Sequence, residues 1–202
     1  RKNWKEGKAE KMSNWKRQIR GIPQTFHTRD DESGDKYISG YFVVFGSNYE
    51  IWDGATESVD PHAFDEALDA DIRCLIDHDT RLVLGRTKSG TLTLKVDQKG
   101  LYGEVKINQA DQDAMNLYER VKRGDVDQCS FGFDIVSERY EETEAGIHWT
   151  IEKVILYEVS VCTFPAYEET EVSARKKDYG SIKKREMDAW KKKTLGKLKG
   201  DK

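Results

Sequence analysis

The feature that most constrains the fold is a series of short apolar runs, rich in β-branched and aromatic residues, in the middle of the chain. Glycine and polar turns separate these runs, and several alternate between apolar and polar residues. Such alternation is typical of β-strands, because a period of two places the apolar side chains on one face of a sheet. Strands are expected at residues 38–46, 72–76, 82–85, 92–96, 101–107, 128–138, 147–151 and 154–164.

Two segments carry the pattern of a helix. The first begins at Pro61, because Asp60 is a suitable N-cap and proline is favoured at the first helical position. The second lies between Asp111, its expected N-cap, and Gly124, where it ends. Its apolar stripe follows helical spacing: Ala114, Leu117, Tyr118 and Val121. The sequence therefore predicts a mostly antiparallel, barrel-like β domain with helices packed outside.

The two ends of the chain differ from its centre. Lys and Arg are abundant in both ends, while the centre is acidic and the net charge is -3. We expect a basic, flexible N-terminal segment at residues 1–36, a folded domain at 37–174 and a Lys-rich tail at 175–202. This balance argues against a uniformly basic nucleic-acid-binding protein. The sequence has no bilayer-spanning apolar run and no signal-peptide pattern, which favours a soluble cytosolic protein.

The three cysteines, Cys74, Cys129 and Cys162, lie far apart in the sequence. A disulfide framework or a zinc site would need closer spacing. We therefore expect free, mostly buried thiols, and no metal or cofactor.

His78 differs from the other three histidines because it follows an apolar strand and lies between Asp77 and Asp79. The end of a rigid strand is a place where a side chain is presented to a cleft. Taken alone, however, a histidine in this position is more often structural than catalytic.

Ser130 begins a strand directly after the second predicted helix. If Phe131 and Phe133 face the core, Ser130 and Gly132 share the opposite face. The glycine keeps that face open, so that an acyl group can reach the serine hydroxyl. Without other observations, a serine that merely lines a strand remains the favoured interpretation.

Glu158 is a carboxylate within an otherwise apolar strand, where alternation places it on the face of Leu156 and Ser160. Such a group is costly to bury unless it is paired. An imidazole partner would pair with it and would have its tautomer fixed in return. A salt bridge to Lys or Arg is the alternative.

Together these segments resemble the prohead (capsid maturation) serine proteases of tailed phages. The resemblance runs from about residue 40 to residue 167. It rests on the order and spacing of residues 57–64, 77–79, 84–85, 99–101, 130–133, 158–162 and 165–167. It implies a fold similar to the herpesvirus assemblins, which is a small antiparallel β-barrel surrounded by a few helices.

The resemblance also implies a serine endopeptidase that needs no cofactor. Ser130 would attack the scissile carbonyl, with His78 as its base. Glu158 would complete the triad, although the herpesvirus enzymes use a second histidine there, which leaves His148 as the alternative. The oxyanion hole would fall near residues 164–166, where Pro165 has no N–H to donate.

The substrates implied by the resemblance are the major capsid protein and the scaffold, cleaved inside the immature phage head in the host cytoplasm. The enzyme would also cleave itself, and its weakly structured tails are natural targets. Because the herpesvirus relatives dimerise, self-association stays open, whereas no membrane or specific nucleic acid is expected as a partner. The alternative is a non-enzymatic capsid assembly or scaffolding factor on the same fold, which would not need His78, Ser130 and Glu158 to converge.

Replacement of Ser130 by alanine, with Cys129 retained, is predicted to abolish proteolysis, because a thiol that faces the core is inert. Mass spectrometry of the variant incubated with its capsid precursor measures this. Proteolysis that survives the replacement would remove Ser130 from the mechanism.

Overall fold

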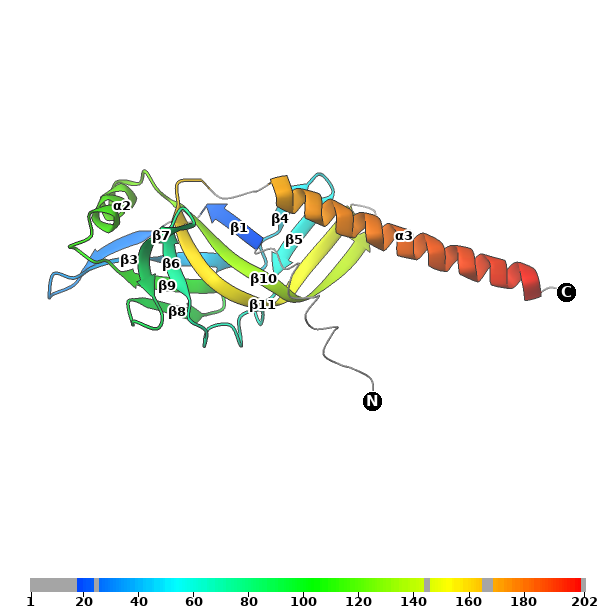
Figure 1. Ribbon diagram of the computed structural model, residues 1–202, viewed down its shortest axis with the longest axis horizontal. Coiled ribbons are helices and arrows are strands. Elements are labelled where there is room, and N and C mark those ends of the chain that lie inside the picture. Colours follow the sequence, from blue (N-terminus) through cyan, green and yellow to red (C-terminus); the bar gives the residue numbers. More distant parts are fainter. Residues whose placement is uncertain (1–17, 24–25, 144–145, 165–168, 201–202) are drawn as a thin grey trace. The chain divides into compact units, whose positions relative to one another are not determined.

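The computed structural model describes residues 18–23, 26–143, 146–164 and 169–200. The chain divides into two units, Arg1–Ala166 and Tyr167–Lys202, and each is described by itself. Within its described residues the first unit holds two β-sheets and one helix, and the second unit holds a long helix (Figure 1). The fold is thus mostly β with few helices, as predicted.

The larger sheet has seven strands and is organised around two long antiparallel partners, β10 (Gln128–Thr143) and β11 (Gly146–Cys162). Figure 1 shows both as long, curved ribbons that run through the first unit. β1 (Gln18–Pro23) pairs with the free side of β10. β5 (Ala55–Val59) pairs in parallel with the first part of β11, and β4 (Tyr49–Trp52) pairs antiparallel with β5. The last part of β11 pairs with β6 (Arg73–Ile76), which continues to β7 (Asp79–Arg86).

The smaller sheet has four strands in the order β2 (His27–Asp30), β3 (Lys36–Val44), β9 (Gly100–Lys106) and β8 (Leu92–Val96). β8 and β9 form the antiparallel hairpin that the sequence predicts at residues 92–107. Apolar side chains from both sheets form one hydrophobic cluster, in which Phe42 and Leu101 of the smaller sheet join Phe131 and Phe133 of the larger one. The face of β10 that carries Phe131 and Phe133 is therefore buried in the core and is not available to a substrate.

The second predicted helix is confirmed as α2 (Gln112–Arg123). The Asp111 side chain accepts hydrogen bonds from the backbone N–H groups of Asp113 and Ala114, and Gly124 closes the helix with a φ of 84°. All four residues of the predicted stripe are buried: Ala114, Leu117, Tyr118 and Val121.

The first predicted helix is wrong: residues 61–69 form a series of turns. The turns are closed by hydrogen bonds between residues three apart, such as that from the Ala67 N–H to the Phe64 carbonyl. The Ala63 carbonyl, which an α-helix would pair with Ala67, instead accepts a hydrogen bond from the N–H of Val154 on β11. Docking onto β11 thus replaces a helical hydrogen bond that the Asp60–Pro61 start signal alone would predict.

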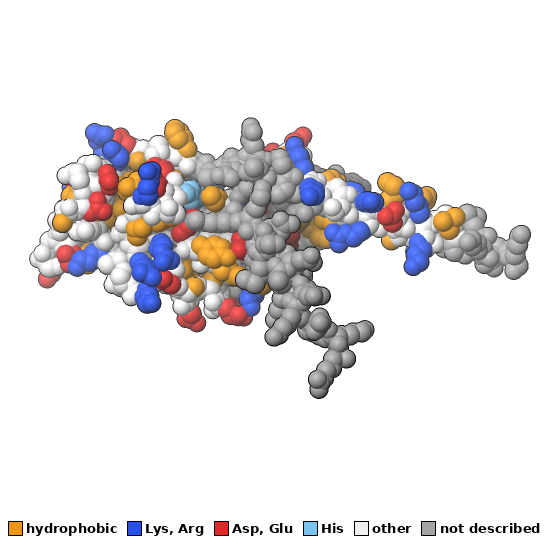
Figure 2. Space-filling model, viewed as in Figure 1, with side chains coloured by type: hydrophobic (Ala, Val, Ile, Leu, Met, Phe, Trp, Pro, Cys, Tyr) orange, Lys and Arg blue, Asp and Glu red, His pale blue; other side chains and the backbone are white. Residues whose placement is uncertain are grey.

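Both ends of the chain carry secondary structure. β1 and β2 lie within residues 1–36, and α3 (Glu169–Gly200) covers most of the Lys-rich tail. Figure 2 shows Lys and Arg side chains on α3 beside hydrophobic ones, and Met187, Trp190 and Leu195 are exposed. Among the described residues no helix has both the length and the apolar character that crossing a membrane requires.

The packing of α2 predicts that Leu117→Ala lowers the free energy of unfolding by about 2–5 kcal/mol, because it leaves a cavity under a buried stripe. Urea denaturation monitored by circular dichroism measures the change. Glu119→Ala, on the exposed side of the same helix, is the matched control and is expected to stay within about 0.5 kcal/mol of the parent. An equal loss in both variants would contradict the assigned burial of Leu117.

Candidate active site

The pairing of β10 with β11 sorts their side chains between two faces. Phe131 lies opposite Val159, and both belong to the hydrophobic core. Ser130 lies opposite Ser160, and Gly132 lies opposite Glu158. Since residues directly opposite in an antiparallel pair share a face, Ser130, Ser160 and Glu158 lie together on the face away from the core.

A β-bulge interrupts the alternation of side chains between the two faces that the sequence predicts around Glu158. The register shifts by one residue between Gly132 and Phe133, so that Leu156 pairs with Phe133 while Glu158 pairs with Gly132. Leu156 therefore packs in the core, on the opposite face from Glu158, and the prediction that the two share a face is wrong. The expected shared face of Glu158 and Ser160 is confirmed. The bulge reverses the direction of the side chains and lets one strand serve both the core and the site.

His78 lies at the end of β6, in the turn that joins this strand to β7. Asp77 and His78 both have positive φ, 47° and 61°, which is the mark of a type I′ hairpin turn. The Asp77 carboxylate accepts a hydrogen bond of 2.8 Å from the Thr163 N–H, and the Asp77 N–H donates to the Val161 carbonyl. These two hydrogen bonds hold the turn at the end of β11, a few residues after Glu158.

The turn brings His78 to Glu158. Nδ1 of His78 lies 2.7 Å from Oε1 of Glu158, and the Ser160 hydroxyl donates to Oε2 of the same carboxylate at 2.6 Å. Glu158 is almost completely buried, so that both of its oxygens are held by neighbours of fixed position. A buried carboxylate next to Nδ1 favours the tautomer with its proton on Nδ1 and a lone pair on Nε2. Nε2 is itself buried and has no hydrogen-bond partner among the described residues.

Ser130 is fully buried, and its hydroxyl donates a hydrogen bond of 2.7 Å to the backbone carbonyl of Arg20. Within the described part of the chain, therefore, the Ser130 hydroxyl is bonded to β1 and forms no hydrogen bond with His78. The group that holds the serine hydroxyl belongs to β1.

β1 runs antiparallel along β10, with Gly21 opposite Ser130 and Arg20 opposite Phe131. The Arg20 side chain turns to the core side, where its guanidinium forms a two-pronged ion pair with the Glu57 carboxylate of β5. The side chains of this pair are 5% and 0% exposed. The guanidinium also lies over the Phe133 ring, 5.7 Å from its centroid. Arg20 thus holds β1 in two ways: its backbone carbonyl is bonded to Ser130, and its side chain is paired with Glu57 in the protein interior.

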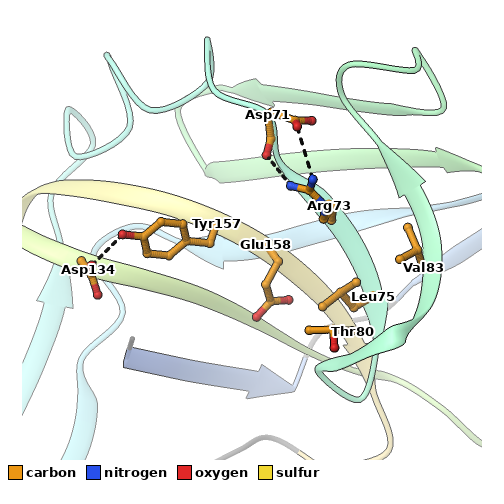
Figure 3. A pocket seen from close by; sticks show the side chains of 8 residues that line it. All are labelled: Asp71, Arg73, Leu75, Thr80, Val83, Asp134, Tyr157 and Glu158. Carbon is orange, nitrogen blue, oxygen red and sulfur yellow. Dashed lines mark hydrogen bonds and ion pairs between the residues drawn. The ribbon is translucent and has the colours of Figure 1, made fainter. Parts of the chain in front are cut away.

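A groove of about 490 Å³ also borders Glu158. Figure 3 shows Leu75, Thr80 and Val83 on one side of it, opposite Tyr157 and Glu158 of β11. The Tyr157 hydroxyl donates to one oxygen of Asp134 at 2.6 Å, whereas the other oxygen, Oδ1, has no partner among the described residues.

The three cysteines are buried free thiols, as predicted. Cys129 faces the core, and its sulfur donates to the Tyr41 carbonyl at 3.2 Å. Burial raises the pKa of Cys74 and that of Cys162, which keeps both thiols protonated near neutral pH. Cys129 thus lies on the core face of β10, opposite to the face that Ser130 shares with Glu158.

His148 lies on β11 ten residues before Glu158, which corresponds to roughly 30 Å of strand. Its two ring nitrogens contact the hydroxyls of Thr56 and Ser58 at 2.7 and 2.8 Å. His62 forms an exposed pair with Asp65, and His27 lies on β2. Of the four histidines, His78 is the one that contacts Glu158. Most of the segment expected to form the oxyanion hole, residues 165–166, lies outside the described residues.

Three comparisons bear on the family. The sequence pattern of the family described as "Caudovirus prohead serine protease" matches residues 24–185. The chain is 30% identical over 162 residues to the prohead protease of Enterobacteria phage HK97, which covers 78% of this chain and 69% of that protein. The solved structure of the bacteriophage T4 capsid assembly protease, gp21, is similar in fold, with a TM-score of 0.52 at 11% identity, over 75% of this chain and 99% of the T4 chain.

The chain is therefore a serine protease. It belongs to the caudovirus prohead serine proteases, and its protease role is in capsid maturation, as the sequence resemblance implies.

Three residues at this place have no role predicted from the sequence. Ser160 is expected only to share a face with Glu158, Glu57 belongs to a segment that matches the family, and Arg20 lies in the segment expected to be flexible. The alternation in β11 was a usable signal for Ser160. No local pattern indicates that Arg20 and Glu57 meet, since they are 37 residues apart in the sequence.

Thiol reagents are predicted to react slowly with the folded protein and to leave proteolysis intact, because Cys74, Cys129 and Cys162 are buried. Mass spectrometry after maleimide treatment at neutral pH, with and without denaturant, measures the labelling. Cys129→Ala should retain cleavage of a capsid precursor. Rapid labelling of Cys129 with loss of cleavage would contradict this assignment.

Proposed function

We propose that Ser130, His78 and Glu158 form the catalytic triad of this protease. Ser130 Oγ attacks the carbonyl carbon of the substrate while Nε2 of His78 takes its proton, and His78 then protonates the leaving amine. Water hydrolyses the resulting ester, so that each cycle consumes one water and yields one carboxylate and one amine. Base assistance of this kind contributes about 10²–10⁴-fold to the rate.

The observation that carries the proposal is the contact between His78 Nδ1 and the buried Glu158 carboxylate, at 2.7 Å. It leaves a lone pair on Nε2, which is the form that a general base requires. Ser160 holds the second oxygen of Glu158 and so restricts rotation of the carboxylate. Glu158 would also stabilise the imidazolium that forms when His78 accepts the proton.

The described conformation is, on this proposal, a closed form of the enzyme. The Ser130 hydroxyl is bonded to the Arg20 carbonyl and its surroundings are buried, while Nε2 of His78 has no partner among the described residues. Catalysis then needs the serine hydroxyl to turn from the β1 carbonyl toward His78. Departure of β1 would open the edge of β10, where an extended substrate could add as a strand.

The substrates proposed are capsid and scaffold proteins, cleaved inside the immature head in the host cytoplasm, together with the chain itself. The proposal keeps residues 37–174 as the protease domain and the flanking segments as targets for self-cleavage. It also treats the two sheets and their common core as a counterpart of the assemblin-type barrel. Self-association remains part of the proposal because the related enzymes dimerise.

Glu158→Gln is predicted to lower kcat for cleavage of the capsid precursor by about 10⁴-fold with little change in KM, because the amide no longer fixes the tautomer or stabilises the imidazolium. His148→Ala is the matched control and should retain activity, since its ring contacts only hydroxyls in the described part of the chain. Initial rates of precursor cleavage measure both. Loss of activity in the His148 variant, with activity kept in the Glu158 variant, would make His148 the third member instead.

A further inference from the structure

We infer that the peptide bond between Arg20 and Gly21 is a self-cleavage site, and that Glu57 selects arginine as the residue on the acyl side of the bond that is cut. The inference rests on the proposed function, because it assumes that Ser130 is the nucleophile. It adds the substrate class and the residue that recognises it.

The position of β1 at Ser130 is that of a bound substrate. An extended segment pairs antiparallel with the strand that carries the nucleophile, and the Arg20–Gly21 peptide group lies beside Ser130. The Ser130 hydroxyl is 2.7 Å from the Arg20 carbonyl oxygen, and the carbonyl carbon is one bond of about 1.23 Å beyond that oxygen. Of the carbonyls along β1, that of Arg20 is the one with which the described Ser130 hydroxyl forms a hydrogen bond.

The Arg20 side chain is recognised by a site built into the protein interior. Glu57 accepts from two different nitrogens of the guanidinium, Nε and Nη2, and both side chains are buried. The geometry matches the planar fork of arginine, whereas a lysine would present a single point charge. The Phe133 ring covers the cation from the side of β10.

A buried carboxylate of this kind is costly without a cation beside it. Glu57 belongs to β5, which pairs with β11 and places Glu57 in register with Trp149, so its backbone position is set by strands other than β1. If β1 leaves, the carboxylate remains as the floor of a site that a second arginine side chain can enter. A neutral or acidic side chain would leave Glu57 buried without that compensation.

β1 also has the character of a segment that the protease can lose. It lies at the edge of its sheet, where it pairs with β10 alone among the described strands. The match to the prohead protease family begins at residue 24, directly after β1. The part of the chain that the family pattern matches therefore does not include β1, the strand that pairs with β10 at Ser130.

The proposed step balances as ordinary peptide hydrolysis. Ser130 Oγ forms an ester with the Arg20 carbonyl carbon, the bond from that carbon to the Gly21 nitrogen breaks, and His78 passes the serine proton to the Gly21 amine. Water then cleaves the ester. The products are a segment that ends in the carboxylate of Arg20 and a protease that begins with the free amine of Gly21.

The experiment on the full chain is N-terminal sequencing and intact-mass measurement after incubation. A new N-terminus at Gly21, which is absent from the Ser130→Ala variant, is expected. Arg20→Gln should lower the rate at this bond by at least about 10²-fold, since it removes the cation that Glu57 recognises. Arg20→Lys should be cleaved at a rate between those of the wild-type chain and Arg20→Gln, because lysine keeps the positive charge but lacks the planar fork of arginine.

The specificity of Glu57 is tested in trans with the peptide Gln-Ile-Arg-Gly-Ile-Pro and the same peptide with Gln in place of Arg. The wild-type protein should prefer the arginine peptide in kcat/KM by at least about 10²-fold. Glu57→Gln should reduce this ratio toward one, a change that a merely structural role would not cause. Glu50→Gln, an exposed residue of the neighbouring strand β4, is the matched control and should keep the ratio.

The outcomes distinguish failure of this inference from failure of the proposed function. A protein that cleaves its capsid precursor but keeps the Arg20–Gly21 bond and shows no preference for arginine overturns this inference and leaves the proposed function standing. A protein that cleaves neither precursor nor peptide, nor itself, overturns both. If Glu57→Gln fails to fold, the peptide preference of the wild-type protein and the Arg20 variants decide the question without it.

Discussion

The site depends on the pairing of β10 with β11. This register places Ser130 opposite Ser160 and Gly132 opposite Glu158, with the core residues Phe131 and Val159 between them on the other face. A single bulge then returns Leu156 to the core. One antiparallel pair thus supplies the serine, the carboxylate and the hydroxyl that orients it, while the same two strands carry much of the hydrophobic core. A one-residue slip would exchange the two faces and abolish the site.

Glu158 and Glu57, two of the buried carboxylates near this pair, each need a partner because charge is costly in the protein interior. Glu158 meets an imidazole and a hydroxyl, whereas Glu57 meets a guanidinium. The first arrangement suits proton transfer, since an imidazole gains and loses a proton near neutral pH. The second suits recognition, because a guanidinium stays charged and its shape fits a carboxylate.

The imidazole reaches Glu158 through a turn with two consecutive residues in the left-handed region, Asp77 and His78. Each such residue costs about 1–2 kcal/mol when it is not glycine. The turn is held by the hydrogen bonds between Asp77 and the end of β11, so the surrounding structure maintains a conformation that the local sequence disfavours. Local backbone strain at a functional position is a common feature of active sites.

The sequence by itself determined the local features. Alternating apolar residues determined most strands, the spacing of the α2 stripe determined that helix, and the order of His78, Ser130 and Glu158 indicated the family. The strands and the helix depend on neighbours within a few residues, which a linear pattern records, and the family is indicated by the order and spacing of motifs along the chain. The tertiary structure alone decided that residues 61–69 form turns rather than a helix, that a bulge separates Leu156 from Glu158, and that Arg20 reaches Glu57. Those outcomes depend on strand register and on contacts between distant segments, and neither has a signature in the local sequence.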